Sequence, residues 1–321
     1  MTTEILQPDD AGLSRAREIL RDGGLVAFPT ETVYGLGGDA ANDHAVARIF
    51  DAKGRPRFNP LIAHVASLDA ARKLARFDHR AERIANAFWP GPLTLVLPLA
   101  EGARLSPLVT AGLDTVAIRV PAHPVARALL TEFGAALAAP SANPSGRVSP
   151  TRAEHVLSGL SGRIAAVIDG GPCKVGVEST ILGLYGPRPV LLRPGGLPVE
   201  AIEDLLGTRL DNMAAAERPN APGQLSSHYA PRARVRLNVR SPEPGEFWLG
   251  FGPEAAGAEL NLSPAADLVE AAANLFHYLR EADARISPDA TIAVSPIPDQ
   301  GLGRAINDRL RRAAAPRPGA G

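Results

Sequence analysis

Residues 27–40, AFPTETVYGLGGDA, leave an apolar stretch at Pro29 and then place two threonines, a glutamate, a tyrosine and three glycines close together. The run before the proline, GLVAF at 24–28, has the composition of a buried strand. Loops at strand ends often carry functional side chains, and glycine lets the backbone curve tightly. We therefore expect this strand to bring Thr30 and Thr32 to the rim of a cleft, where their hydroxyls bind a small polar ligand. An ordinary strand-to-helix loop is the alternative.

The glycines of this stretch do not have the context of a dinucleotide-binding turn. GLGGDA matches G-x-G-x-x-A, but the glycines of a Rossmann turn follow the strand directly, and here PTETVY intervenes. No acidic strand end follows at the spacing of about 20 residues that such a fold requires. The sequence also lacks G-x-x-x-x-G-K-[ST] and G-x-S-x-G. We therefore expect no nicotinamide cofactor.

Composition narrows the class of protein. At 321 residues the chain exceeds the usual size of one hydrophobic core, which predicts two domains. Lys+Arg and Asp+Glu number 34 each, so net charge gives no argument for a nucleic-acid or membrane partner. Cys173 is the single cysteine and the seven histidines are scattered, so we expect neither a disulfide nor a protein-built metal site. The sequence shows no signal peptide and no long apolar run, which favours a soluble cytoplasmic protein.

Short β-branched runs alternate with helical patterns over residues 1–207, which predicts a mixed α/β domain with a large twisted sheet. The expected strands are 24–28, 60–65, 93–98, 115–121, 135–139, 165–170, 179–185 and 190–195. The expected helices lie near 12–22, 43–52, 80–88, 123–133, 151–158 and 198–206. Residues 208–232 are polar and contain several prolines, which is typical of a linker. In residues 233–315 three apolar strands separated by helical patterns at 264–283 and 303–314 predict a small parallel sheet.

A basic segment, KGRPRFNPLIAHV at 53–65, contains two prolines that favour extended geometry. In an extended chain alternate side chains share a face, so we expect Lys53, Arg55, Arg57 and Asn59 to lie together. Several cations held on one face suit a polyphosphate ligand. A charged surface loop is the alternative for this segment.

Polar groups also follow several other expected strands. In AAPSANPSGRVSPTRAEHV, residues 138–156, Ser149 is expected to cap a helix whose first turn holds Pro150, and such a helix start suits a phosphate. Arg119 lies in an apolar strand, where a guanidinium is costly unless it meets an anion. Ser179 begins one strand and Arg193 ends another. We expect these groups to converge on one anion-binding cleft.

The motifs PTETVYGLG, KGRPRFNPL, WPGPLTLVL, VAIRVP, APSANPSG, GGPCKVGVESTI and LLRPGG together resemble the YrdC-type domain of the threonylcarbamoyl-AMP synthase family. The resemblance covers roughly residues 8–205, and SSHYAP and GLGRAINDRLRRA are similar to the two-domain form of that family. It implies an α/β fold with an N-terminal YrdC-type twisted mixed sheet, flanking helices and a concave cleft. It also implies a smaller C-terminal Rossmann-like parallel α/β domain. The domain boundaries we expect are 1–207, 208–232 for the linker, and 233–315.

The resemblance also implies an activity. Enzymes of that family are nucleotidyltransferases that convert L-threonine, bicarbonate and ATP into threonylcarbamoyl-AMP and pyrophosphate. Magnesium enters with the ATP phosphates, and the product passes to a separate tRNA threonylcarbamoyl transferase. The resemblance implies at most a weak contact with tRNA and no membrane partner.

Site residues follow from the resemblance position by position. The residues implied for L-threonine are Thr32, His64, Arg119, Ser179 and the backbone of Ala139. The residues implied for ATP are Arg55, Asn59, Thr115, Ser141, Ser149, Arg193 and the linker residue Tyr229. The implied catalytic quartet is Lys53, Arg55, Ser141 and Asn143. This chain has QLSS before HYAP, where relatives often carry basic residues, so linker contact with phosphate is less clearly implied.

The sequence contains no obvious general base, and a carbamate oxygen is already anionic, so we expect alignment and charge neutralisation to carry the reaction. A YrdC-type surface that binds RNA without catalysis is one alternative. Chemistry on carbamoyl phosphate is another, although the acylphosphatase and zinc-finger segments of such relatives are missing here.

Overall fold

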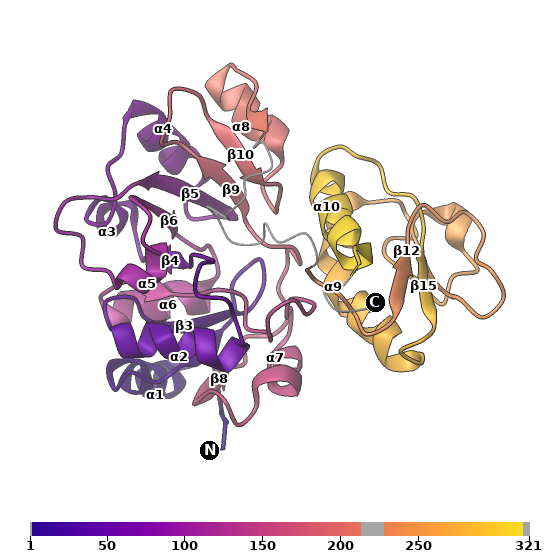
Figure 1. Ribbon diagram of the computed structural model, residues 1–321, viewed down its shortest axis with the longest axis horizontal. Helices are drawn as coiled ribbons and strands as arrows, with labels where there is room; N and C mark the ends of the chain where they lie inside the picture. The colour runs from indigo at the N-terminus through magenta and orange to yellow at the C-terminus, as the bar shows by residue number, and fades with distance from the viewer. Residues whose placement is uncertain (1, 213–227, 317–321) are drawn as a thin grey trace.

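The computed structural model describes residues 2–212 and 228–316. Two α/β domains lie side by side in Figure 1, and the larger holds an eleven-stranded sheet with the order β1-β8-β2-β3-β7-β4-β6-β5-β9-β10-β11. The strands of this sheet are β1 (Glu4–Leu6), β2 (Val26–Phe28), β3 (Gly35–Asp39), β4 (Ile62–His64), β5 (Leu93–Pro98), β6 (Thr115–Arg119), β7 (Leu137–Ala138), β8 (Ala166–Ile168), β9 (Thr180–Gly183), β10 (Val190–Arg193) and β11 (Asp211–Asn212). Parallel and antiparallel pairs both occur, so the mixed α/β fold class is confirmed.

Helices cover both faces of this sheet. They are α1 (Asp10–Arg21), α2 (Asp43–Lys53), α3 (Leu68–Arg72), α4 (His79–Phe88), α5 (Pro107–Thr110), α6 (Pro124–Phe133), α7 (Ala153–Leu160) and α8 (Val199–Leu206). Side chains alternate along β2, so Val26 and Phe28 pack with α1 and α6, while Ala27 packs with α2 and α7 on the other face. Burial of both faces explains why these strands are short apolar runs.

The glycine-rich half of the opening stretch differs from our expectation. Gly35–Asp39 forms β3, which pairs antiparallel with β2, so the loop itself is only the segment 29–34. None of Gly35, Gly37 and Gly38 has a positive φ. A Cβ on Gly37 would lie 2.8 Å from the ring of Phe28, so this glycine makes room for a core side chain and does not serve a tight turn.

The smaller domain has a four-stranded sheet with the order β12-β15-β13-β14, and all its pairs are parallel, as predicted. Its elements are β12 (Arg234–Arg236), β13 (Phe247–Gly250), the 3-10 turn η1 (Pro253–Ala255), β14 (Leu260–Asn261), α9 (Leu268–Arg285), β15 (Thr291–Val294) and α10 (Leu302–Ala314). In Figure 1, α9 and α10 lie on the side of this sheet that faces the larger domain. Among the described residues, no helix is both long and apolar enough to cross a membrane.

The two domains meet closely where the segment after Cys173 passes α9. Gly176 has a φ of +78°, and a Cβ there would lie 2.2 Å from the carbonyl oxygen of Ala272. Only glycine fits both the backbone conformation and the space. The exact boundaries of the domains and of the linker remain a prediction.

Candidate active site

Several strand ends of the larger domain open onto one small cavity. β4 and β6 are parallel neighbours, and their register places His64 beside Arg119. The cavity has a volume of about 50 Å³, which is space for a few water molecules. The expected site residues that line it are Thr32, Arg55, His64, Arg119, Ala139, Ser141, Ser179, Arg193 and Tyr229. The predicted convergence on one cleft is therefore confirmed for Arg119, Ser179 and Arg193, and Arg55 lines the same cavity.

Arg119 lies at the end of β6, buried, with its guanidinium held by three oxygen acceptors. Its Nη2 donates to Glu31 Oε1 at 2.6 Å, its Nη1 to Thr32 Oγ1 at 2.8 Å, and its Nε to the Gly91 carbonyl at 3.3 Å. Burial alone would raise the pKa of Glu31, but the charge of Arg119 holds that pKa below its usual range. Each terminal nitrogen of Arg119 carries a second N–H, so the fork can still bind a carboxylate.

The hydroxyl of Thr32 belongs to a directed chain of hydrogen bonds. Thr30 Oγ1 donates to the Val33 carbonyl at 2.6 Å and accepts the backbone N–H groups of Thr32 and Val33 at 3.2 Å. Because its proton is used there, Thr32 must donate in the 2.8 Å contact between the two hydroxyls. Thr32 is then left with acceptor capacity only, so it can receive a ligand hydroxyl or ammonium but cannot donate to it.

His64 is buried and presents an acceptor. Its Nδ1 lies 3.2 Å from the Ile62 carbonyl, so Nδ1 carries the proton and Nε2 accepts. Burial, and then the charge of Arg119, lower the pKa of His64 to about 3. The ring is therefore neutral at physiological pH.

Arg193, at the end of β10, meets the start of β9. Its Nη2 donates to the Ser179 carbonyl at 2.9 Å and to Ser179 Oγ at 3.3 Å. Ser149, a buried residue that we expected to cap a helix, instead donates its hydroxyl to Glu178 Oε1. The capping prediction is wrong because α7 begins at Ala153, and its N-cap residue, Arg152, makes no side-chain cap bond.

The basic segment is not the extended array we expected. α2 runs through Lys53 and ends at Gly54 in the left-handed region, which turns the chain. Lys53 is buried, and its Nζ donates to the carbonyls of Ser141 and Asn143. Arg55 lines the cavity and donates to the carbonyls of residues 59 and 60, whereas Arg57 lies at the surface with 65% of its side chain exposed.

Two of the predicted site residues, Asn59 and Asn143, have side-chain oxygens without a hydrogen-bond partner among the described residues. Asn143 donates its side-chain amide to the carbonyls of Pro144 and Arg147, and its Oδ1 is buried without a hydrogen-bond partner among the described residues. Asn59 Oδ1 is likewise buried and has no hydrogen-bond partner among the described residues. Five of the expected site residues do not line the cavity, namely Lys53, Asn59, Thr115, Asn143 and Ser149. Thr115 lies at the opposite end of β6 from Arg119.

The segment between the domains closes the cavity. Tyr229 is 1% exposed and lines it together with His228. Burial raises the pKa of Tyr229 and lowers that of His228 to about 3. The QLSS residues, 224–227, lie outside the described residues.

Sequence reasoning missed three charged residues at this site, namely Glu31, Glu178 and Arg309. In GVEST, residues 176–180, we predicted a role only for Ser179, which follows Glu178 directly. Arg309 comes from α10 of the other domain, and its Nε donates to Glu178 Oε2 at 2.8 Å. No spacing in the sequence connects residues that lie 131 positions apart.

A second cluster, which we did not expect from the scattered histidines, joins the domains at Glu154, His155 and His277. Its spacing is compatible with a metal ion, but its hydrogen bonds favour another state. His155 Nδ1 accepts the Thr151 N–H at 3.2 Å, so its proton lies on Nε2 and points at His277 Nδ1, 3.2 Å away. Nε2 would have to lose that proton to bind a metal, so the pair is best described as two neutral hydrogen-bonded rings.

Fold and site together define a two-domain α/β protein with an arginine-lined cleft that is covered by the segment joining its domains. A family model described as Telomere recombination, for Sua5, YciO and YrdC, matches residues 18–195, and one described as Threonylcarbamoyl-AMP synthase, C-terminal domain, matches residues 197–315. The chain is 44% identical to the threonylcarbamoyl-AMP synthase of Bacillus subtilis, over 98% of this chain and 96% of that protein. It is 43% identical to the Pyrococcus abyssi enzyme of the same name, over 93% of each chain. The crystal structure of P. abyssi Sua5 complexed with L-threonine superposes with a TM-score of 0.89 at 40% identity and covers 98% of both chains. The chain belongs to the threonylcarbamoyl-AMP synthase family.

Proposed function

We propose that this protein is an L-threonylcarbamoyladenylate synthase, which forms threonylcarbamoyl-AMP and pyrophosphate from L-threonine, bicarbonate and ATP. The observation that carries the proposal is the convergence of Arg55, Arg119 and Arg193 on a cavity that also presents Thr32 and His64. Fixed cations suit the carboxylate and phosphates of these substrates, while the neutral acceptors suit an amino acid's hydroxyl and ammonium. The relatives' names and the threonine complex of P. abyssi Sua5 support the same assignment.

L-Threonine binds with its carboxylate on the fork of Arg119. Thr32 Oγ1 and His64 Nε2 offer acceptors, so they receive hydrogen bonds from the substrate and favour an amino acid that carries a hydroxyl. The backbone of Ala139 and the hydroxyl of Ser179 complete the pocket. With the carboxylate and hydroxyl held, the amine gives up its ammonium proton to solvent and attacks bicarbonate, which forms the carbamate and releases water.

ATP binds along Arg55, Asn59, Thr115, Ser141, Ser149, Arg193 and Tyr229. Arg55 and Arg193 stabilise charge on the phosphates as the carbamate oxygen attacks the α-phosphorus and pyrophosphate leaves. Lys53 binds two backbone carbonyls here, so its proposed catalytic role includes fixing the loop that carries Ser141 and Asn143.

Magnesium enters this proposal as part of the substrate MgATP. The ATP phosphates would hold the ion, because the buried oxygens of Asn59 and Asn143, which have no partner among residues 2–212 and 228–316, do not line the cavity. The ion neutralises phosphate charge when it is bound. No protein-built metal site is required.

The product has a defined fate in this proposal. A separate tRNA threonylcarbamoyl transferase consumes it, in the cytoplasm, and any contact of this protein with tRNA is weak. A domain division at 1–207, 208–232 and 233–315 accompanies the assignment.

The test is incorporation of labelled bicarbonate into an adenylate by the full chain, with and without L-threonine. We expect threonine-dependent label in a nucleotide product, with one pyrophosphate released for each. Nucleotide or RNA binding without any threonine-dependent pyrophosphate would refute the assignment and favour a binding protein.

A further inference from the structure

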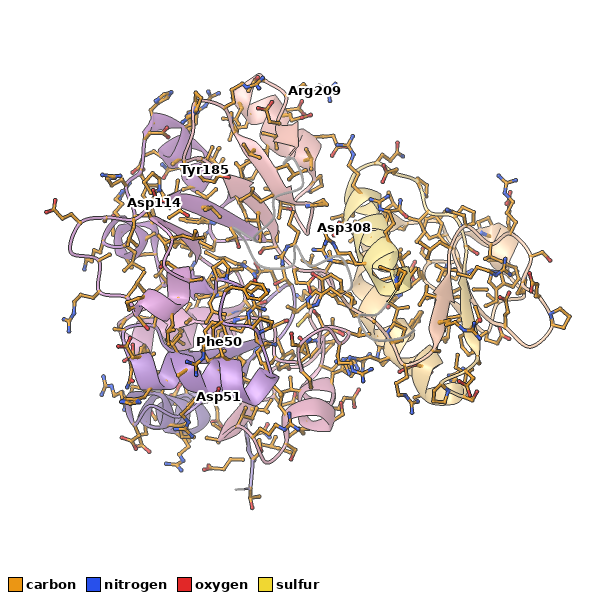
Figure 2. All side chains as sticks on the ribbon, in the orientation of Figure 1. Phe50, Asp51, Asp114, Tyr185, Arg209 and Asp308 are labelled. Carbon is orange, nitrogen blue, oxygen red and sulfur yellow. The ribbon has the colours of Figure 1, made fainter. Side chains whose placement is uncertain are left out.

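A second cavity, with a volume of about 670 Å³, lies between the two domains and away from the cleft. Its walls are the segment 144–148, α7, residues 230–232 and the last turns of α9, and we call it the α7–α9 pocket. None of its described lining residues also lines the cleft cavity. Figure 1 places α7 at the lower end of the domain boundary, whereas Figure 2 places Asp308 of α10 near the upper end. The α7–α9 pocket is therefore separate both from the cleft and from the contact of α10 with the larger domain.

The size of the α7–α9 pocket is that of a small-molecule site. Such sites have volumes of about 300 to 1,000 Å³ and combine apolar walls with a few polar groups. Here Pro144, Val148 and Pro231 provide apolar surface, and Ser158 adds a hydroxyl. The space suits an organic molecule better than a bare ion.

The charged residues of the α7–α9 pocket are three arginines and two carboxylates, namely Arg147, Arg232, Arg280, Glu154 and Asp283. Asp283 pairs with Arg232 at 3.3 Å and also accepts the Ala233 N–H at 2.8 Å. Glu154 is 67% exposed, so water screens its charge. Burial lowers the pKa of His155 to about 3, so this ring adds no charge. The lining residues therefore carry an excess of positive charge, which favours an anionic ligand.

Arg280 is half-buried in this pocket and donates to two backbone carbonyls. Its Nη2 donates to the Val148 carbonyl, and its Nε donates to the Ser149 carbonyl at 3.5 Å. These bonds use two of the five N–H groups of a guanidinium, so three stay available to a ligand. Within residues 2–212 and 228–316, Arg280 forms no ion pair with a carboxylate.

A comparison with Arg309 shows why this arrangement is unusual. Both arginines belong to the C-terminal domain and contact the larger domain, but Arg309 has the Glu178 carboxylate at 2.8 Å. Burial lowers the pKa of Arg280 to about 10, and the charge of Asp283 offsets only part of that change. Arg280 is still charged at neutral pH, and a partly buried guanidinium gains free energy when an anion binds to it.

Arg147 enters the same pocket from the larger domain. Its backbone is fixed, because its carbonyl accepts the Asn143 side-chain amide at 2.9 Å and its N–H donates to the Pro144 carbonyl at 3.2 Å. Its exposed guanidinium makes no hydrogen bond or ion pair with the part of the chain that the structure describes. Two arginines from different domains therefore present unused donors to one cavity.

We propose that the α7–α9 pocket is a second ligand site, in which Arg147 and Arg280 bind the phosphate group of a small phosphorylated molecule of about the size of a mononucleotide. The planar guanidinium matches phosphate oxygens in pairs, and the pocket has room for the rest of such a molecule. Walls from both domains favour a small molecule over a nucleic-acid strand, which needs an extended basic groove. Nucleoside phosphates and free polyphosphates share this chemistry. The site does not depend on the reaction proposed for the cleft.

The test measures binding of labelled AMP and of labelled pyrophosphate to the full-length chain by equilibrium dialysis, with adenosine as a ligand without phosphate. All variants carry Arg55→Ala, which weakens the cleft, so the binding that remains reports the α7–α9 pocket. Arg147→Glu reverses a charge without removing a described side-chain contact, and Arg280→Lys keeps the charge but loses the planar fork. Arg163→Glu is the matched control, because Arg163 is an exposed arginine just after α7 that does not line the pocket.

We expect the Arg55→Ala chain to bind AMP, pyrophosphate or both, and to bind adenosine at least about ten-fold more weakly, because hydrogen bonds to a charged group make up much of the affinity. Arg147→Glu should raise the dissociation constant about ten-fold or more for the same reason. Arg280→Lys should have an intermediate effect, and Arg163→Glu should have none. Binding of AMP identifies a nucleoside phosphate as the ligand, whereas binding of pyrophosphate alone identifies a free polyphosphate.

Unchanged affinity in Arg147→Glu would overturn the inference, as would an equal loss in Arg163→Glu. Adenosine bound as tightly as AMP would show that phosphate is not recognised. Absence of binding by both phosphate compounds would also overturn the proposal. If only a purified transfer RNA bound, and Arg147→Glu weakened it, this surface would belong to a nucleic-acid interface and the small-molecule site would be wrong.

Discussion

Replacing Arg119 with methionine should separate its contribution to folding from its contribution to threonine binding. The substitution leaves the Glu31 carboxylate, 12% exposed, without the guanidinium that lies 2.6 Å away. Removing one partner of a buried ion pair costs about 3 to 5 kcal/mol. Glu31 keeps a hydrogen bond from the Ala122 N–H at 3.0 Å, so we expect a loss near the lower end, about 3 kcal/mol.

The binding loss has a different origin. Two charge-assisted hydrogen bonds to the substrate carboxylate contribute about 1.5 kcal/mol each or more, so the dissociation constant of L-threonine should rise about 100-fold or more. Urea unfolding measures the first quantity, and calorimetric titration with L-threonine measures the second. The wild type and Arg119→Met are compared in the same buffer.

Arg119→Met/Glu31→Gln is the decisive control. Neutralising Glu31 removes the unpaired charge, so the double variant should regain about half or more of the lost free energy of unfolding. Its affinity for L-threonine should stay as low as that of the single variant. Recovery of threonine affinity together with stability would show that Arg119 only supports the fold, and would refute its role as the carboxylate ligand.

Three further predictions test the site, the buried histidines and the domain contact. Arg55→Ala should lower the rate of threonine-dependent pyrophosphate release by roughly 10² to 10³, and a near-normal rate would contradict its phosphate role. Burial lowers the pKa of three histidines from 6.5 to about 3, namely His64, His155 and His228. Their depressed folded-state pKa values stabilise the fold fully above pH 6.5, and this stability is lost as pH falls from 6.5 towards 3; each should cost about 2 kcal/mol between pH 7.5 and pH 5 in urea unfolding. A flat profile there would show that these rings are not buried in solution. Gly176→Ala should destabilise the chain by at least about 2 kcal/mol more than Gly171→Ala, because both glycines have a φ of +78° but only Gly176 faces backbone within 4 Å; equal losses in the two variants would mean that the domains do not touch at Gly176.

The sequence allowed most elements of the fold to be predicted because their periodicity is local. The expected strands of the large sheet all appear, usually shorter than predicted, and the second sheet is parallel as expected. β3 was missed because Gly35–Asp39 has the composition of a turn, while its conformation is set by the neighbouring Phe28 ring, which needs the space that glycine leaves. β1 and β11 were missed because they are very short edge strands that depend on their partners.

The site was predictable to the extent that its residues follow strand ends. Arg119 and Arg193 were found because a guanidinium in an apolar run requires an anion. The extended array of Lys53, Arg55 and Arg57 failed because the helix before it continues through Lys53, so the period-two argument began one element too early. Ser149 failed as a cap because a buried carboxylate, Glu178, competes for its hydroxyl, and no local pattern reveals that partner.

The contribution of the second domain is the part that sequence reasoning reaches least. Arg309 lies in a basic stretch, RAINDRLRRAA, whose composition is typical of a solvent-exposed helix face, so the sequence does not single out any of its arginines. Only the packing of α10 against the larger domain distinguishes Arg309, which is fully buried, from Arg311, which is exposed. A buried guanidinium is stable only when it is paired with an anion. The anion here is the Glu178 carboxylate in the wall of the cleft. The second domain therefore contributes a charge to the site, and a chain cut before α10 would leave Glu178 without its ion pair to Arg309 in the cleft where the triphosphate is proposed to bind. We accordingly expect truncation to weaken the binding of ATP more than the binding of L-threonine. Calorimetric titration of the truncated and full-length chains with each substrate would measure both changes.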